Sequence, residues 1–150
     1  MKTAIHIQRC VPAEGIPTSA SLRGWALAAL GKTRGEIGLR IVGTAESRAL
    51  NARYRHKDKP TNVLSFPYPE LTSEGVLGDI VVCAPVVARE AREQNKSHRA
   101  HWAHMIVHGV LHLLGHDHIE NKDAERMEAR ERALMSLFGF ADPYVLIKKK

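Results

Sequence analysis

The fold is decided by one stretch, residues 97–118, which reads SHRAHWAHMIVHGVLHLLGHDH. Five of the nine histidines of the chain recur in it at helical spacing: His98, His101, His104, His108 and His112. At about 100° per residue, these positions fall within an arc of roughly 120°, so they form one stripe along a helix. The apolar residues between them supply a flank that can pack against a core. The sequence therefore predicts a helix from Ser97 to Leu114 with histidines along one face.

Two histidines of this stripe have the spacing of metal ligands. His108 and His112 are four residues apart, which places both imidazoles on one helix face, one turn apart. With Gly115 and His118 the pattern is H-x-x-x-H-x-x-G-x-x-H, in which the glycine can adopt φ > 0 and let the chain turn back. Three imidazoles without a further protein ligand are typical of a catalytic zinc site. We therefore expect one Zn²⁺ per chain, bound by His108, His112 and His118.

The sequence allows more than one role for each polar residue beside these ligands. Asp117 either accepts the second N–H of a ligating imidazole or only turns the chain after the helix. His116 is a candidate for a further ligand or an acid–base group beside the metal. We expect His101 and His104 to be core or supporting histidines rather than ligands, and His98 to lie on the surface. The competing interpretation is a stripe of solvated or hydrogen-bonded histidines that binds no metal.

The same histidine spacing occurs in metzincin peptidases. In those enzymes the residue after the first histidine is a glutamate that serves as the general base. Gly109 occupies that position in this chain, and the helix offers no other obvious carboxylate. A metal-dependent peptidase-like hydrolase is therefore an alternative and not the first hypothesis.

The rest of the chain alternates between the two-residue periodicity of strands and the 3.6-residue periodicity of helices. Strands are predicted at residues 4–8, 37–42, 63–66 and 79–83. Further helices are predicted from about 19 to 30, 44 to 54 with Thr44 as N-cap, 85 to 96, and from 121 or 123 to 138. Gly31 and Gly139 end two of them. This order predicts an α/β (α+β) fold in one domain, residues 1–150, with a small mixed β-sheet packed against helices.

The composition is typical of one globular domain, and the net charge bears on the kind of partner that the protein binds. The 150 residues are 44% hydrophobic and 25% charged, which excludes a disordered or collagen-like chain. Lys and Arg number 22 against 16 Asp and Glu, a net charge of +6 that is typical either of a protein with an anionic partner or of a basic surface without one. Tyr54 and Tyr68 lie too far apart in sequence to predict a surface for stacking bases.

Cysteine usage and the chain ends bear on the compartment. Cys10 and Cys83 are far apart and belong to no C-x-x-C motif, so we expect free, buried thiols in a reducing cytosol. The N-terminus has no apolar signal region, and no stretch is apolar enough to span a bilayer. We therefore expect a cytoplasmic protein that does not enter a membrane.

Two separate blocks of the chain resemble a known family. HGVLHLLGHDH at 108–118, with HWAH at 101–104, closely resembles the signature of the YbeY endoribonucleases, which are bacterial rRNA maturation factors. YRHKDKPTNVLSFP at 54–67 and GDI at 78–80 resemble further parts of that family. The family has tyrosine where this chain has His116, so this imidazole either adds acid–base capacity or fills the same space.

The resemblance implies a function as well as a fold. It implies an α/β fold with the metal-binding helix at its centre and a zinc-dependent endoribonuclease specific for single-stranded RNA. It also implies a role in rRNA maturation, notably at the 3′ end of 16S rRNA, and in ribosome quality control in the cytoplasm. Single-stranded RNA, rRNA and the small ribosomal subunit are then the expected partners.

RNA cleavage requires positive groups that stabilise the phosphate charge, and the charged loop that follows residue 54 offers them. Arg55 can bind two phosphate oxygens through its guanidinium fork and stabilise the transition state, while zinc activates water or polarises a phosphate oxygen. Lys57 and Lys59 are candidates for salt-dependent contacts with the RNA backbone, or else are ordinary solvated lysines. The non-catalytic alternative is a zinc-stabilised RNA-binding factor for ribosome assembly, in which the histidines only organise the fold.

Overall fold

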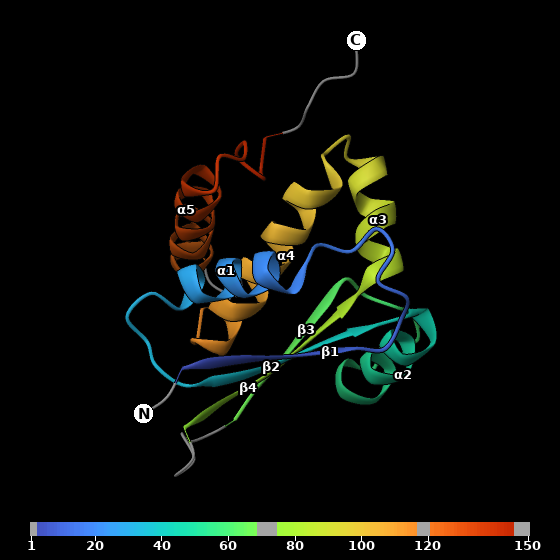
Figure 1. Cartoon of the computed structure of the whole chain (residues 1–150). Helices are drawn as coiled ribbons and strands as arrows, with labels where there is room; N and C mark the ends of the chain where they lie inside the picture. Colours follow the sequence, from blue (N-terminus) through green and yellow to red (C-terminus); the bar gives the residue numbers. More distant parts are fainter. Residues whose placement is uncertain (1–2, 69–74, 117–120, 146–150) are drawn as a thin grey trace.

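The structure is a computed structural model that describes residues 3–68, 75–116 and 121–145 (Figure 1). In chain order its elements are β1 (Ala4–Arg9), α1 (Ser19–Leu30), β2 (Glu36–Val42), α2 (Thr44–Arg55), β3 (Val63–Pro67), β4 (Val76–Cys83), α3 (Ala84–Glu93), α4 (His98–Leu113) and α5 (Asn121–Leu137). The predicted class, a small mixed sheet packed against helices, is confirmed.

The four strands form one sheet in the order β1-β2-β4-β3. Strands β1, β2 and β4 are parallel, and β3 pairs antiparallel with β4 at one edge. Helix α1 connects β1 to β2, while α2 and β3 lie between β2 and β4 in the chain. Figure 1 shows α1, α4 and α5 on one side of the sheet and α2 on the other.

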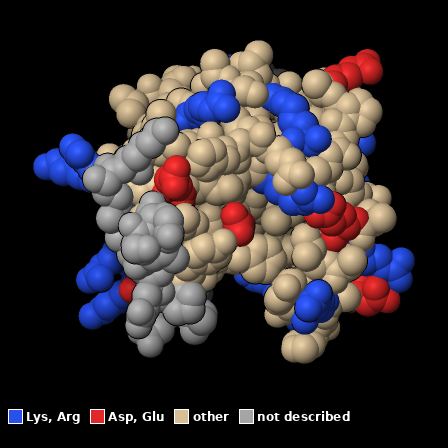
Figure 2. Space-filling model, turned by 60° about the horizontal axis from the view of Figure 1, so that its bottom comes forward, with Lys and Arg blue, Asp and Glu red and all other residues tan. Residues whose placement is uncertain are grey.

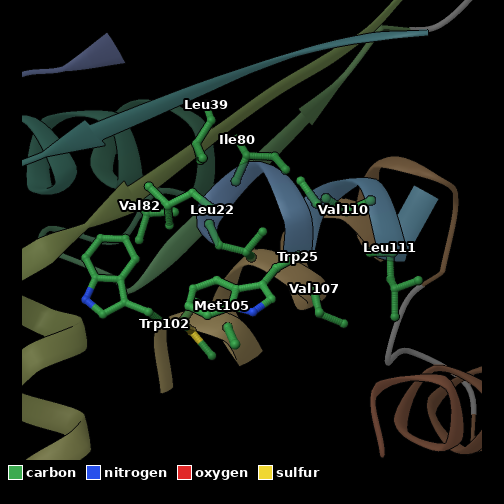
Figure 3. Close-up of a cluster of buried hydrophobic side chains, with 14 of the residues drawn as sticks. Leu22, Trp25, Leu39, Ile80, Val82, Trp102, Met105, Val107, Val110 and Leu111 are labelled. Carbon is green, nitrogen blue, oxygen red and sulfur yellow. The ribbon is translucent and has the colours of Figure 1, made fainter. Parts of the chain in front are cut away.

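The main core lies between the sheet and the helix pair α1 and α4. Along β2, Ile37, Leu39 and Ile41 are buried and the residues between them are partly exposed, as the alternation predicts. Figure 3 shows Leu39 and Ile80 of the sheet directed toward side chains of α1 and α4. Burial of such large apolar side chains is the dominant stabilising term in folding. Helix α4 therefore lies in the interior, as expected for the centre of the fold.

Gly109 allows α4 to lie very close to the sheet. A Cβ atom at this position would lie 2.9 Å from Ile80 Cγ2 and 3.2 Å from Val63 Cγ2, closer than side chains normally pack. The carbonyl of Gly109 also accepts a hydrogen bond of 2.9 Å from Ser65 Oγ of β3. The side of α4 at residue 109 thus faces β3 and β4, and a glutamate placed there would point into the sheet.

The helix stops predicted at Gly31 and Gly139 are confirmed, and Thr18 is found to cap the first helix. Thr18 caps α1 by accepting from the Ser21 amide at 3.2 Å, and Gly31 ends this helix with φ 58°. Gly139 has φ 85° after α5. The predicted N-cap at Thr44 is wrong, because Gly43 is the cap residue and no side-chain cap hydrogen bond forms there.

Two expectations about the β4 region and the cysteines need correction. Strand β4 begins at Val76 and not at residue 79. The sequence places Gly78 before the strand, but in the structure it is a strand position. Glycine fits there because a Cβ would lie 2.4 Å from the Phe66 carbonyl oxygen. Both cysteines are free as predicted, but only Cys83 is buried while Cys10 is exposed. Among the helices that the structure describes, none is both long and apolar enough to cross a membrane.

Substituting glycine by alanine in two helices tests the close packing of α4. Gly109→Ala gains about 1 kcal/mol of helix propensity but should lose about 1–3 kcal/mol through overpacking against Ile80 and Val63. Gly24→Ala in α1 meets nothing within 4 Å and should only stabilise. Denaturant unfolding of both variants measures this difference. If Gly109→Ala gained as much stability as Gly24→Ala, the close approach would be refuted.

Candidate metal centre

The predicted stripe of histidines exists along α4. The ring centroids of His101 and His104 lie 6.3 Å apart, those of His104 and His108 lie 6.1 Å apart, and those of His108 and His112 lie 4.6 Å apart. The first two rings are buried and the last two are partly exposed. The stripe therefore runs from the interior toward the surface at the C-terminal end of the helix.

The N-terminal part of the stripe is structural. His101 is buried, and its Nε2 lies 2.9 Å from Oε1 of Glu90 in α3. His98 accepts a hydrogen bond of 3.1 Å from Trp102 Nε1 and is only partly exposed. Burial lowers the pKa of His98 below its usual value, which favours the neutral ring that can accept this bond. Both rings are therefore held by hydrogen-bond partners and are not arranged as metal ligands.

His108 and His112 approach each other as the ligand prediction requires. Their Nε2 atoms are 3.1 Å apart. Two imidazoles that share a tetrahedral zinc at about 2.0–2.1 Å have ring nitrogens about 3.3 Å apart, so the observed separation suits a shared ion. The other nitrogen of His108, Nδ1, lies 3.3 Å from Oε2 of Glu131.

Glu131 of α5 is a buried acid at the centre of this group, with 0% of its surface exposed. Oε2 also contacts His104 Nε2, and Oε1 accepts a hydrogen bond of 2.7 Å from the Tyr144 hydroxyl. Burial alone would raise the pKa of Glu131, but the hydrogen bonds from His104 and His108 outweigh it and hold the pKa well below its usual range. Burial and the bond to this carboxylate raise the pKa of Tyr144, so its hydroxyl remains a donor.

Burial favours the neutral form of His104. It lowers the pKa of this ring more than the contact with Glu131 raises it. A neutral ring that faces an ionised carboxylate with Nε2 carries its hydrogen there. The remaining nitrogen, His104 Nδ1, is buried without a hydrogen-bond partner among the described residues.

The cluster can hold a metal ion. The donor atoms of His104, His108 and Glu131 all lie within 4.8 Å of one another, so these three side chains could bind a cation. The Nε2 atoms of His108 and His112 offer a different arrangement, on the opposite side of the His108 ring. Imidazole nitrogen and carboxylate oxygen both suit zinc, so the residues present fit the expected ion.

Helix α4 ends in the turn that the glycine predicts. Gly115 has φ 96°, its amide donates to the His112 carbonyl at 3.0 Å, and the His116 amide donates to the Leu111 carbonyl at 3.1 Å. This pair of bonds is a Schellman motif, which turns the chain out of the helix axis. His116 is partly exposed after that turn. The predicted ligand His118 and its neighbour Asp117 lie outside the described residues.

The predicted phosphate-binding residues lie on the surface beyond α2. The side chains of Arg55, Lys57 and Lys59 are exposed, and none forms a hydrogen bond or ion pair with another described side chain. Asp58, in contrast, is paired with Arg48, with Nε 2.7 Å from Oδ1. The loop therefore presents positive charge, although no described hydrogen bond joins Arg55 to the histidine cluster.

Buried and partly buried polar residues hold this loop by hydrogen bonds. Ser47 Oγ of α2 donates to the Thr61 carbonyl and accepts from the Thr61 amide, both at 2.9 Å. Asn51 Nδ2 donates to the Lys59 carbonyl at 2.9 Å. Asn62 Nδ2 donates to Glu90 at 3.0 Å, and Glu90 also contacts His101 of α4. One carboxylate of α3 thus links the loop to the histidine helix.

A groove of about 730 Å³ lies on the face of the sheet that carries α2. Tyr54 and Tyr68 both line it, so the structure brings together two rings that the sequence leaves apart. The Tyr54 ring packs edge-on against Phe66 at 5.1 Å, and the Tyr68 hydroxyl lies 3.4 Å from Asp79. Figure 2 brings the lower side of Figure 1 forward and shows Lys and Arg in separate groups with Asp and Glu between them. The charge of +6 does not form a single basic patch on that side.

The prediction missed the residues that partner the histidines. Glu131, Tyr144 and Glu90 come from α5, from the segment after α5 and from α3, and none has a distinctive spacing relative to the stripe. The only available signal was the position of Glu131 itself, an acidic residue four positions after Met127 on the buried side of an amphipathic helix.

Replacing Glu90 tests the link between the loop and α4. Burial alone would raise the pKa of Glu90, but bonds from His101 and Asn62 outweigh it and hold the pKa below its usual value. Glu90→Gln should therefore lose about 1–2 kcal/mol of unfolding free energy at pH 7. Because the folded pKa is depressed, this contribution is complete above the unfolded value of 4.5 and disappears as the pH falls through the folded value.

Unfolding free energies measured from pH 7 to pH 3 check that dependence. The exposed Glu93, which pairs with Arg89 at 3.7 Å, provides the matched control Glu93→Gln, with an expected loss below about 0.5 kcal/mol. Equal losses for both variants, or a Glu90→Gln difference that does not shrink in acid, would contradict the assigned role.

Comparison with known proteins identifies the family of the chain. The family model described as Endoribonuclease YbeY matches residues 20–139. A curated Endoribonuclease YbeY from Methylococcus capsulatus is 56% identical over 131 residues, which cover 86% of this chain and 87% of that protein. The solution structure of TM1509 from Thermotoga maritima matches 95% of this chain and 99% of its own, with a TM-score of 0.55 and 25% identity. The chain therefore belongs to the YbeY endoribonuclease family.

Proposed function

We propose that this protein is a zinc-dependent endoribonuclease that cleaves single-stranded RNA. In this proposal it acts in the cytoplasm on rRNA, notably at the 3′ end of 16S rRNA, and in ribosome quality control with the small ribosomal subunit as partner. The observation that carries the proposal is the pair of Nε2 atoms of His108 and His112, 3.1 Å apart, in a member of an endoribonuclease family.

We assign the zinc ligands to His108, His112 and His118. His108 and His112 are partly exposed, whereas Glu131 and His104 are buried, so only the first pair can meet a macromolecular substrate. Both carboxylate oxygens of Glu131 already accept hydrogen bonds, which argues against its being a ligand. His118 is assigned from the spacing in the sequence, after the turn at Gly115. Zinc bound there supplies Lewis acidity toward water or a phosphate oxygen.

The protein's own charged groups then act on the RNA. Arg55 carries a fork of N–H donors that can stabilise the charge that develops on the phosphate. Its exposed position at the end of α2 leaves the guanidinium available to RNA. Lys57 and Lys59, exposed in the same loop, attract the backbone without regard to sequence. Asp117 and His116 are proposed to support the third ligand.

Two other functions fit the metal but are less well supported. A peptidase needs a general base after the first histidine, and that position is Gly109, which packs against Ile80 and Val63 of the sheet. A non-catalytic assembly factor needs only a structural ion, but structural zinc sites are usually closed by cysteine. Cys83 is the only buried cysteine and lies in β4 rather than on α4.

Removing the metal tests the function. Chelation, or His112→Ala, should reduce bound zinc from about one per chain to background and abolish cleavage of single-stranded RNA. His6→Ala, which removes an exposed imidazole from β1, should retain both. Elemental analysis and cleavage of matched single-stranded and duplex RNA measure the two effects.

The same experiment separates the alternatives. Cleavage should stop at chelator concentrations that leave the melting transition of the domain in place. Unfolding on chelation with no RNA cleavage beforehand would favour the structural site. Turnover of peptides, or stoichiometric zinc in His112→Ala, would refute the proposed function or its ligands.

Charge reversal at Arg55 tests its role in the transition state. Arg55→Glu should reduce kcat/KM on single-stranded RNA by at least about 10²–10³-fold, the usual cost of losing one transition-state donor, with zinc content unchanged. Arg53→Glu removes an exposed arginine of the same helix and is the matched control. Similar rates for the two variants would remove Arg55 from the mechanism.

A further inference from the structure

Glu131 connects three parts of the chain at the metal cluster. Its Oε2 contacts His104 and lies 3.3 Å from His108 Nδ1, both on α4. Its Oε1 accepts a hydrogen bond of 2.7 Å from Tyr144, in the segment that follows α5. A carboxylate with 0% exposure is very costly unless such bonds satisfy it.

These contacts favour one tautomer of His108. An ionised carboxylate only accepts hydrogen bonds, and Oε1 of Glu131 already accepts one from the Tyr144 hydroxyl. With Nδ1 of His108 3.3 Å from Oε2, the tautomer that matches this contact carries its hydrogen on Nδ1 and leaves the lone pair on Nε2. That Nε2 is the atom 3.1 Å from Nε2 of His112.

We propose that Glu131 is a positioning residue of the zinc site, which holds the His108 ring by its Nδ1–H and so presents an unprotonated Nε2 to the ion. Ligating histidines commonly donate their second N–H to such a carboxylate, which orients the ring and increases its basicity. The inference rests on the proposed function in one respect only, that His108 is a ligand.

Neighbouring contacts hold the carboxylate in place. The ring of His104 packs edge-on against Tyr144 at 5.4 Å between centroids. Arg132 lies over the Tyr144 ring at 5.2 Å and donates to Asp142 at 3.0 Å. The segment after α5 is therefore attached to the helix at the point where Tyr144 reaches Glu131. His104 and Tyr144 act on the metal only through this carboxylate.

The tautomer of His108 can be measured without enzymatic activity. In metal-free protein labelled with ¹⁵N-histidine, long-range ¹H–¹⁵N spectra distinguish Nδ1–H from Nε2–H rings. Wild-type His108 should be the Nδ1–H form, and Glu131→Gln should shift it toward Nε2–H. Zinc affinity, measured by competition with a chromophoric chelator, should fall about 10–100-fold in this variant.

Two further variants complete the experiment. Glu125→Gln, which removes an exposed carboxylate of the same helix, should leave both tautomer and affinity unchanged. Tyr144→Phe keeps the carboxylate but removes one of its donors, and should weaken zinc binding by less than the Glu131 variant. Tyr144→Phe carries the test if Glu131→Gln does not fold.

Three results would overturn the inference. The first is a Glu131→Gln protein, or Tyr144→Phe in its place, that binds zinc within twofold of wild type. The second is an unchanged Nδ1–H tautomer in Glu131→Gln. The third is an X-ray absorption spectrum in which wild-type zinc has a carboxylate ligand that Glu131→Gln loses. Normal zinc binding without RNA cleavage would instead refute the proposed function and leave this inference intact.

Discussion

Helix α4 is buried along most of its length, so each imidazole that it carries has to find a polar partner. The partners come from different elements: Trp102 for His98, Glu90 for His101, Glu131 for His104 and His108, and His108 for His112. Because two of these partners are carboxylates on α3 and α5, satisfying the histidines also fixes how those helices pack on α4. The same bonds that stabilise the fold therefore shape the metal cluster.

The arrangement has a direction that matters for function. Near the N-terminal end of the stripe His101 contacts Glu90, and near its middle His104 contacts the buried Glu131. Toward the C-terminal end the rings of His108 and His112 become partly exposed, and Gly115 turns the chain out of the helix. On the opposite side, Gly109 brings α4 against β3 and β4. The proposed ion therefore lies where a rigid interior helix reaches the surface, with the basic loop of Arg55 attached through Glu90 and Asn62.

Much of this could be predicted because it depends on local periodicity. A few neighbouring residues suffice to predict the histidine stripe and the order of strands and helices along the chain. The same is true of the positive φ at Gly115 and the helix stop at Gly31. The partners could not, because Glu131 and Tyr144 meet His108 only after α5 folds back onto α4. The N-cap expected at Thr44 was wrong because Gly43, the residue before the helix, is the cap residue. The late start expected for β4 was wrong because Gly78 lies inside the strand, where glycine usually marks a break.

The position of the ion decides between the two arrangements that the cluster allows. Crystals of the zinc-loaded protein, measured with anomalous scattering at the zinc edge, locate it directly. We predict one peak about 2.0–2.1 Å from Nε2 of both His108 and His112, with the carboxylate of Glu131 still hydrogen-bonded to His108 Nδ1. A peak bound by His104, Glu131 and the Nδ1 side of His108, or His108 and His112 rings turned apart around no ion, would contradict it.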